Sequence, residues 1–243
     1  MNWFTRLLKN YWPLFLNGTK YTLLLALAGT AGGFIIGLLV GIVRTIPKQS
    51  GGNGGITFRS LALTFINGLL SVYVEVFRGT PMMVQAMLIF YGLPEFAGIR
   101  ISALPAALSV IIINTGAYMS EIVRGGIQSV DRGQTEAAMA IGMTHWQTML
   151  HVVLPQAIRN ILPATGNELV INLKDSSVLN VITVGELFFA TKTVAGIFYR
   201  MYEPFLIAAA VYLTLTFITS RLISYIEKHM DGPDSFTLAQ TKH

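Results

Sequence analysis

The chain alternates between long uncharged stretches and short polar ones. Residues 21–43, 101–120 and 204–220 carry no charged side chain at all. About 20 consecutive apolar residues are enough for a helix to cross the hydrocarbon core of a bilayer. Together with two longer hydrophobic regions, these stretches predict an all-α, polytopic membrane protein. About five spans are expected, near 20–44, 61–93, 101–124, 157–189 and 203–226.

The second and fourth hydrophobic regions are too long for single straight helices. The second, 61–93, is interrupted by charged and helix-breaking residues, namely Glu75, Arg78, Gly79 and Pro81. This pattern predicts a kinked or two-piece helix. In the fourth, 157–189, Pro163 and Gly166 are expected to break the helix. We expect one crossing there, followed by a short second helix or a re-entrant segment.

The two ends of the chain are expected to lie outside the spans. Large apolar side chains near the N-terminus recur at helical spacing, which predicts an amphipathic helix lying in the membrane surface. Pro13, Asn17 and Gly18 favour a break before the first span; the alternative is that this helix extends the span. The predicted parts are 1–19 at the surface, a transmembrane domain at 20–228, and a polar, disordered tail at 229–243.

The composition removes several functional classes. Charged residues make up 12% of the chain, about half of what soluble domains carry. The absence of cysteine excludes disulfides, thiol catalysis and zinc sites with cysteine ligands. The net charge is +5, but the basic residues form no block or stripe, so nucleic acid is not an expected partner. The four histidines show no metal-like grouping, and no metal site is predicted.

The basic residues also predict an orientation. Cytoplasmic segments of membrane proteins carry an excess of Lys and Arg. With five crossings, that excess is obtained when the N-terminus lies outside and the C-terminus lies in the cytoplasm. Residues 1–19 lack the long apolar core and the cleavage site of a signal peptide, so no cleavage is expected.

Glycines recur at four-residue spacing in the first predicted span, at Gly33, Gly37 and Gly41. Residues four apart lie on one face of a helix, and small residues there let a second helix approach closely. Two interpretations are open: packing against another helix of this subunit, or contact with a second subunit.

A polar but helix-like stretch at about 133–153 lies between the third and fourth hydrophobic regions. Its first part is a strong helix former that ends or bends at Gly142. Thr144, with Gln147 three residues later, has the pattern of a capping box that starts a second helix. Pro155 is expected to close the unit. The sequence thus predicts two short helices in an L shape, which we call the elbow (133–153).

The elbow is expected to present a soft apolar surface beside Glu136 and His145. Its apolar members are Met139, Ile141, Met143, Trp146 and Met149. Methionine-rich surfaces adapt to a partner because their side chains are flexible and polarisable. This surface suits docking into a cleft on a cytoplasmic partner.

The same stretch resembles the EAA signature of bacterial ATP-binding-cassette (ABC) importer permeases. The matching residues are Glu136, Ala137, Ala138, Gly142, Leu154 and Pro155, with Val152 where isoleucine is commoner. Other segments resemble motifs of the polar-amino-acid uptake subfamily, the histidine, glutamine and arginine permeases. These segments are 75–81 (EVFRGTP), 117–126 (AYMSEIVRGG) and 172–177 (NLKDSS). The similarity extends from about residue 15 to about residue 228.

This resemblance implies a type I ABC importer permease fold and a role in amino-acid uptake across the bacterial inner membrane. In the family, the elbow forms coupling helices that dock on the nucleotide-binding subunit. The coupling residues that follow from the match are Glu136, Ala137, Ala138, Gly142, His145, Leu154 and Pro155. The implied partners are an ATPase dimer, a second permease subunit, identical or homologous, and an extracytoplasmic solute-binding protein.

The chain itself is not expected to be an enzyme. It contains no P-loop sequence and no catalytic grouping of cysteine, serine and histidine. No cofactor is expected on this chain, and ATP with Mg²⁺ is expected on the partner ATPase.

Ionisable residues inside a membrane are energetically unfavourable and therefore point to function. A zwitterionic amino acid needs anionic groups for its ammonium and donors for its carboxylate. The candidate substrate site consists of Thr80, Gln85, Asn114, Tyr118, Glu168, Lys174 and Asp175. The alternative for the last two is an internal salt bridge. Two further pairs have the three-residue spacing of simple ion pairs, Glu75 with Arg78 and Glu121 with Arg124.

Two other classes of transporter compete with this interpretation. An ion-gradient-driven secondary transporter would use the same buried carboxylates as ion sites, but it does not explain the EAA spacing. An ABC permease for another solute, such as methionine, would share the elbow but not the polar-amino-acid motifs.

Overall fold

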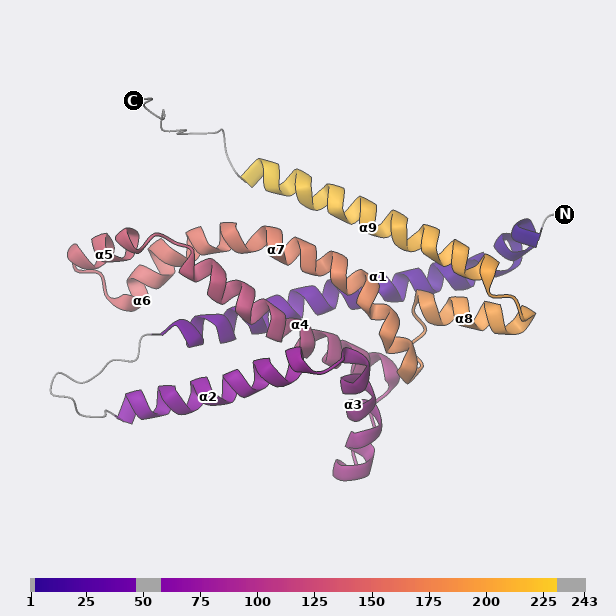
Figure 1. Cartoon of the computed structure of the whole chain (residues 1–243), viewed down its shortest axis with the longest axis horizontal. Coiled ribbons are helices and arrows are strands. Elements are labelled where there is room, and N and C mark those ends of the chain that lie inside the picture. Colours follow the sequence, from indigo (N-terminus) through magenta and orange to yellow (C-terminus); the bar gives the residue numbers. More distant parts are fainter. Residues whose placement is uncertain (1–2, 47–57, 231–243) are drawn as a thin grey trace.

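The computed structural model describes residues 3–46 and 58–230, and every regular element in these ranges is helical. The long helices run along the long axis of the molecule (Figure 1); they are α1 (Trp3–Thr45), α2 (Phe58–Gly79), α4 (Ala103–Gln128), α7 (Leu154–Asp175) and α9 (Tyr202–Met230). The short helices α5 (Arg132–Ala140) and α6 (His145–Thr148) gather at one end, and α3 (Met82–Ala97) points away from the bundle. Residues 47–57, and residues 231–243 of the predicted tail, lie outside the described residues.

The described residues contain four helices that are long and apolar enough to cross a membrane by themselves. These are α1 from Lys9 onward, α2 from Ser60 onward, α4, and α9 as far as His229. A fifth candidate is the bent pair formed by His145–Ile182 and Leu187–Phe198, which meet at 54°. The prediction of an all-α protein with about five spans is therefore confirmed.

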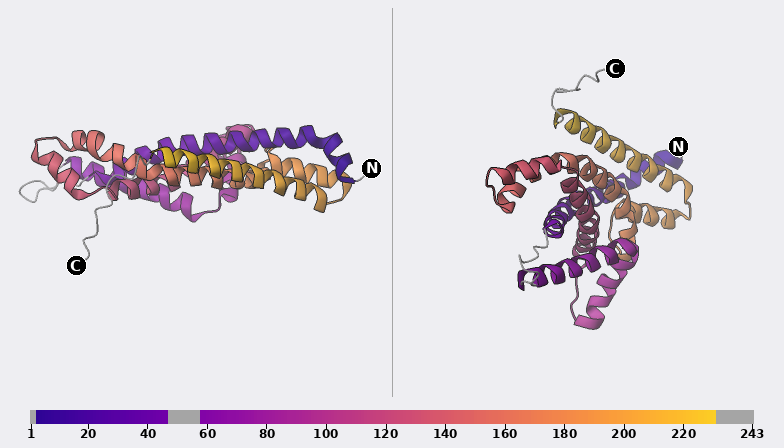
Figure 2. Two further views of the ribbon diagram at one scale, coloured as in Figure 1. Left: turned by 90° about the horizontal axis from the view of Figure 1, so that it is seen from above. Right: turned by 60° about the vertical axis from the view of Figure 1, so that its left-hand side comes forward.

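Helix α1 is unbroken from Trp3 to Thr45, with Pro13 inside it. The break predicted at Pro13, Asn17 and Gly18 is therefore wrong, although the first turns of α1 bend relative to the rest of the helix (Figure 2). That residues 1–19 lie in the membrane surface stays a prediction. Tertiary packing explains the difference. One face of α1 enters a buried cluster composed of Leu7, Phe15, Leu187, Val194 and Ile207. At Gly18 an added methyl carbon would lie 2.9 Å from the Cα of Leu187, so this glycine permits a close backbone contact instead of ending the helix.

The glycine face of α1 packs against α4 of the same chain. A methyl carbon added at Gly41 would lie 2.6 Å from Cγ1 of Val123. One added at Gly37 would lie 2.7 Å from the backbone carbonyl carbon of Met119. Carbon atoms in contact are normally about 3.5–4.0 Å apart. The interpretation of the glycine spacing as packing within the subunit is therefore confirmed.

The predicted break in the second hydrophobic region is confirmed. Helix α2 ends at Gly79 and α3 begins at Met82. Pro81, between them, has an extended conformation with φ −63° and ψ 135°. Proline has no N–H to donate to the preceding turn and keeps the residue before it out of the helical region. The chain therefore changes direction at this point (Figure 1).

The fourth hydrophobic region breaks later than predicted. Helix α7 runs unbroken through Pro163, and a 3₁₀ helix, η2 (Ser176–Ile182), then leads to α8 (Leu187–Phe198). Gly166 lies inside α7, where an added methyl carbon would lie 2.5 Å from Cγ2 of Ile223 in α9. The break expected at Pro163 and Gly166 is therefore wrong, because the glycine serves helix contact. The expected short second helix is present as α8.

A buried carboxylate fixes the turn before α8. Glu186 is fully buried and accepts hydrogen bonds from two backbone N–H groups in the first turn of α8, both at 2.7 Å. It also accepts one from the hydroxyl of Tyr212 in α9 at 3.1 Å. The N–H of Leu187 donates to the hydroxyl of Thr22 in α1 at 3.2 Å. Glu186 is thus the N-cap of α8, and this polar cluster joins α1, α8 and α9.

Candidate functional site

The first half of the elbow is helix α5. Asp131 caps its start by accepting a hydrogen bond from the N–H of Gly133 at 2.6 Å. The helix ends at Ala140, and Gly142 has a φ of 88°, which glycine adopts without steric strain. Gly142 therefore turns the chain from α5 toward α6, as its position in the sequence predicted.

The second half of the elbow starts at a capping box, as predicted from the sequence. The N–H of Gln147 donates to the Thr144 hydroxyl at 3.3 Å, and the N–H of Thr144 donates to the Gln147 side chain at 2.8 Å. A π-helical turn, η1 (Met149–Val153), then leads from α6 directly into α7. Pro155 lies in the first turn of α7, where its missing N–H is tolerated. The prediction that Pro155 closes the unit is therefore wrong.

The elbow carries an exposed apolar surface, which we call the elbow surface (Met139, Ile141, Trp146 and Leu150). Its most exposed member is Ile141, at 81%. Met149, predicted to belong to this surface, is instead buried in a cluster between α4 and α7. The π-helical turn begins at Met149, and the next residue, Leu150, is the one that faces out.

The predicted coupling residues lie on both sides of the elbow. Exposed are Glu136, Ala137, Gly142 and Pro155; half-buried are His145 and Leu154; buried is Ala138. The carbonyl of Ala138 accepts a hydrogen bond from the N–H of Met143 at 3.1 Å. The side chain of Ala138 is 5% exposed, whereas Glu136 and Ala137 are exposed to solvent.

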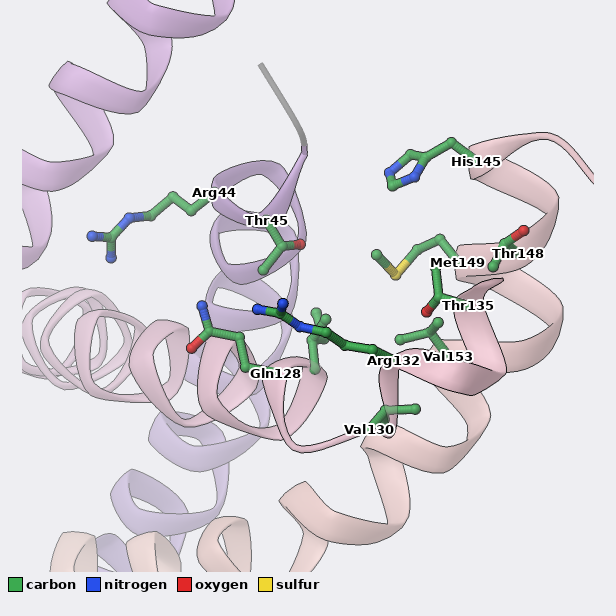
Figure 3. A pocket seen from close by; sticks show the side chains of 11 residues that line it. Arg44, Thr45, Gln128, Val130, Arg132, Thr135, His145, Thr148, Met149 and Val153 are labelled. Carbon is green, nitrogen blue, oxygen red and sulfur yellow. The ribbon is translucent and has the colours of Figure 1, made fainter. Parts of the chain in front are cut away.

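A cavity of about 570 Å³, which we call the elbow cavity, lies behind the elbow (Figure 3). It is bounded by the ends of α1 and α4, by α5, and by α6 with η1. Its polar lining includes Arg44, Thr45, Gln128, Arg132, Thr135 and His145. The sequence did not predict this cavity, because one wall is the end of α1, which is distant in sequence from the lining residues within 127–153.

Three of the predicted substrate residues meet where α2 ends. The Gln85 side-chain amide donates to the backbone carbonyl of Phe77 at 3.0 Å and to that of Thr80 at 2.9 Å. It also donates to the Thr80 hydroxyl at 2.9 Å. The amide of Asn114 in α4 donates to the Phe77 carbonyl at 3.1 Å and to the Gln85 side-chain oxygen at 3.0 Å. These bonds satisfy the last carbonyls of α2, so Thr80, Gln85 and Asn114 hold the α2–α3 joint against α4.

Tyr118 lies apart from this joint, in a cavity of about 540 Å³ beside α2 and α4. The guanidinium of Arg78 lies 5.3 Å from the centre of the Tyr118 ring, within the range of a cation–π contact. In the same cavity Glu121 pairs with Arg124 at 2.6 Å, as their spacing predicted. Glu121 also pairs with Arg44 of α1. The spacing rule could not find this partner, because 77 positions separate it from Glu121.

The predicted ionisable residues of α7 are not joined to one another. Glu168 is 8% exposed, and no hydrogen bond or ion pair connects it to another described residue. Lys174 and Asp175 are exposed, and they form no ion pair with each other in the described part of the chain. The alternative of an internal salt bridge is therefore wrong. Glu75 and Arg78, too, form no ion pair within ranges 3–46 and 58–230.

A buried polar contact that sequence reasoning missed lies one turn beyond Glu168. The amide of Asn172 donates to the hydroxyl of Thr30 in α1 at 2.9 Å. The hydroxyl of Thr115 in α4 donates to the Asn172 side-chain oxygen at 3.1 Å. All three side chains are buried. The signal that could have found them is the isolated polar residue in each of three hydrophobic helices.

A bundle of membrane-crossing helices with polar side chains inside it, and with an exposed elbow at one end, defines a membrane permease subunit. Residues 54–232 match the family described as "Binding-protein-dependent transport system inner membrane component". The chain belongs to this family, and the resemblance to ABC importer permeases is confirmed. It is therefore a multi-pass inner-membrane protein, and the family implies an ATPase and a solute-binding protein as partners.

Relatives from bacteria match the chain over nearly its whole length. The glutamine transport system permease protein GlnP of Escherichia coli (strain K12) is 39% identical over 90% of this chain and 93% of its own. The arginine transport system permease protein ArtQ of Bacillus subtilis (strain 168) is 35% identical over 91% of this chain and 94% of its own. The L-cystine transport system permease protein TcyB of the same strain is 34% identical over 92% of this chain and 89% of its own.

Solved structures agree with this assignment. One chain of a crystal structure of an amino acid ABC transporter with histidines superposes with a TM-score of 0.82 at 38% identity, covering 94% of this chain and 99% of that one. A chain of the MetNI methionine ABC transporter in an inward-facing conformation superposes with a TM-score of 0.73 at 21% identity, covering 89% of this chain and 96% of that one. The second likeness supports the fold alone.

Proposed function

We propose that the chain carries a polar or charged amino acid through the membrane, driven by ATP hydrolysis on a separate ATPase subunit. The observation that carries this proposal is the end-to-end similarity to permeases named for glutamine, arginine and cystine. The elbow surface at one end of the bundle supports it, because it offers the ATPase a place to bind. ATP and Mg²⁺ belong to that partner, and this chain holds no cofactor.

The elbow is the coupling element in this proposal. Glu136, Ala137, Gly142 and Pro155 lie on exposed parts of the elbow, beside the apolar side chains that would enter a cleft of the ATPase. His145 and Leu154 are partly covered, and Ala138 keeps the turn compact. Because η1 continues directly into α7, a displacement of the elbow moves a membrane-crossing helix with it. Closure of the ATPase would thereby shift the balance between two permease conformations.

The proposed orientation places the N-terminus outside and the C-terminus in the cytoplasm. Figure 1 supports it, since α5 and α6 lie at the opposite end of the bundle from the start of α1. The last turns of α9 run back toward the elbow end. The complete importer would contain two permease subunits, identical or homologous, an ATPase dimer on the elbow side, and a solute-binding protein on the other side.

The substrate site that we propose contains fewer residues than the sequence predicted. Glu168 is a carboxylate without a described partner, and a substrate ammonium group would compensate its burial. Asp175 and Lys174 are exposed on the same helix, and Tyr118 lines a cavity on the facing helix α4. Thr80, Gln85 and Asn114 stay in the proposal only as supports of the α2–α3 joint, because their polar groups already bond to protein.

Reconstituted transport tests the proposed function. The complete importer in liposomes, with ATP supplied to the ATPase side, should accumulate one or more polar amino acids from a labelled panel that includes methionine. Glu168→Gln and Asp175→Asn should reduce uptake while the complex still assembles. Uptake driven by an ion gradient without ATP would contradict the proposal. Unchanged uptake in both variants would remove the substrate site but leave the importer.

The elbow surface is tested separately by Ile141→Asp. Ile141 is 81% exposed, so the substitution should not disturb folding, whereas a charge forced into an apolar interface is strongly unfavourable. We expect the ATPase to bind about tenfold more weakly or worse, measured by co-purification from detergent. The matched control is Ile99→Asp, at an exposed isoleucine between α3 and α4. Equal ATPase retention in both variants would show that the elbow surface is not the docking site.

A further inference from the structure

Two charged side chains lie in the second half of α2, a helix long and apolar enough to cross the membrane. Glu75 and Arg78 belong to the span Ser60–Gly79, and both are exposed in this subunit. The end of α2 lies beside the middle of α4, where Asn114 donates to the Phe77 carbonyl (Figure 1). Charges at this depth are too unfavourable to face lipid tails, and ionisable residues inside a membrane mark transport paths and binding sites.

Both side chains line the cavity of about 540 Å³ beside α2 and α4, which we call the charged cavity. Its charged lining comes from α1, α2 and α4 and consists of Arg44, Glu75, Arg78, Glu121 and Arg124. Three of these hold one another. One carboxylate oxygen of Glu121 pairs with Arg44, and the other pairs with Arg124 at 2.6 Å.

Glu75 and Arg78 are the charged groups of this cavity that remain available to a ligand. Neither forms an ion pair with a described residue, although side chains three positions apart on a helix are neighbours, with Cβ atoms about 5–6 Å apart. The guanidinium of Arg78 instead lies 5.3 Å from the centre of the Tyr118 ring, which holds it at the cavity wall. One anionic and one cationic group therefore lie within one helical turn and line the same cavity.

We propose that the charged cavity binds the head group of a zwitterionic amino acid, with Arg78 on the α-carboxylate and Glu75 on the α-ammonium. A single carbon atom separates the ammonium and the carboxylate of an amino acid, so two side chains one turn apart can receive both. A guanidinium suits the first task because its planar N–H groups can bond to both carboxylate oxygens. This inference rests on the proposed function, since it requires the solute to be an amino acid.

The charged cavity is a different place from the proposed site at Glu168, which lies on α7 and is not among the residues that line this cavity. It extends to Arg44 in the last turn of α1, and Arg44 also lines the elbow cavity. The charged cavity therefore leads toward the elbow end of the bundle, the cytoplasmic end in the proposed orientation. The amino acid would reach it on the way from Glu168 to the cytoplasm.

The test measures binding of labelled arginine and labelled glutamine to the purified complex of permease and ATPase in detergent. Loss of a charge-assisted hydrogen bond predicts at least about tenfold weaker binding in Arg78→Gln and in Glu75→Gln. Arg221→Gln is the matched control for the first, because Arg221 is exposed on α9 and stacks on Phe217 at 5.1 Å, outside the cavity. Glu95→Gln, at an exposed carboxylate of α3, is the control for the second. Both controls should bind like the wild type.

Competition by analogues separates direct contact from an indirect structural effect. One analogue of each probe lacks the α-carboxylate, and the other lacks the α-ammonium. In the wild type both should compete at least about tenfold less well than the intact amino acid. Arg78→Gln should abolish the difference for the analogue without the carboxylate only, and Glu75→Gln the difference for the analogue without the ammonium only. A variant that merely loosens the bundle would weaken all three compounds together.

Three outcomes would overturn the proposal while leaving the importer intact. In the first, the importer accumulates a probe in liposomes, but Arg78→Gln and Glu75→Gln bind both probes as the wild type does. In the second, binding weakens but the ratios between amino acid and analogues stay unchanged. In the third, Arg78→Gln separates the two permease subunits on purification, which would assign the pair to the subunit interface. If the wild type accumulates no polar amino acid, the proposed function fails and this inference fails with it.

Discussion

One methyl group added at Gly37 would test how closely α1 and α4 must approach each other. In Gly37→Ala the new carbon would lie 2.7 Å from the carbonyl carbon of Met119 and 2.9 Å from the backbone nitrogen of Ser120. Both obstructing atoms belong to the backbone, so no change of side-chain rotamer relieves the overlap. The Cβ of Met119 lies closer still to the added carbon. The two helices must therefore separate by more than about 1 Å to restore a normal contact distance of about 3.5–4.0 Å.

The expected loss of stability follows from two opposing contributions. Inserting a methyl group into a well-packed helix contact reduces stability by about 1–3 kcal/mol. Alanine, however, favours the helix by up to about 1 kcal/mol relative to glycine. We therefore expect Gly37→Ala to lower the free energy of unfolding by about 1–2 kcal/mol, since the steric contribution is the larger one. The same separation would loosen the contacts at Gly33 and Gly41, which lie on the same face.

The measurement is an SDS titration of the purified permease in mixed micelles, followed by far-ultraviolet circular dichroism. Gly125→Ala in α4 is the matched control, because an added methyl group there meets nothing within 4 Å. The control should be as stable as the wild type, or more stable by up to about 1 kcal/mol. If both variants unfold at the same SDS fraction, backbone contact between α1 and α4 does not limit stability and the reasoning is wrong.

Two further predictions use the same titration. Glu186→Gln should lower the free energy of unfolding by about 1–2 kcal/mol, because the capping carboxylate of α8 is lost. Tyr212→Phe should lower it less, because it removes only one hydrogen bond to that carboxylate. A larger loss in Tyr212→Phe than in Glu186→Gln would contradict the capping role. Asn172→Ala should lower it by about 1–3 kcal/mol because two buried hydroxyls lose their partner. Adding Thr30→Val and Thr115→Val should restore part of that loss, and a further loss instead would contradict this account.

Local features of the elbow could be predicted from the sequence because neighbouring residues determine them. The capping box of Thr144 and Gln147 and the end of the first helix before Gly142 both formed as expected. The break at Pro81 is local as well, since the proline ring itself prevents the helix from continuing. In each case the deciding interaction lies within a few positions of the residue that signals it.

The wrong predictions concern residues whose role depends on distant parts of the chain. Pro13 and Gly166 are helix breakers by propensity, yet packing on neighbouring helices keeps α1 and α7 continuous. Gln85 has the chemistry of a substrate ligand, but the end of α2 uses its donors. Arg44 finds Glu121 across 77 positions, which no spacing rule can anticipate. Sequence therefore predicted the spans and the elbow better than the polar contacts between helices.

The length of α1 has a consequence for how the two faces of the membrane communicate. Its part from Lys9 to Thr45 contains 37 residues, which corresponds to about 55 Å at 1.5 Å per residue. The hydrocarbon core is only about 30 Å thick, so this part of α1 is longer than the lipid tails require. One end packs on α8 and the other borders the elbow cavity. Any tilt imposed on it from one side of the membrane must therefore displace Arg44 on the other.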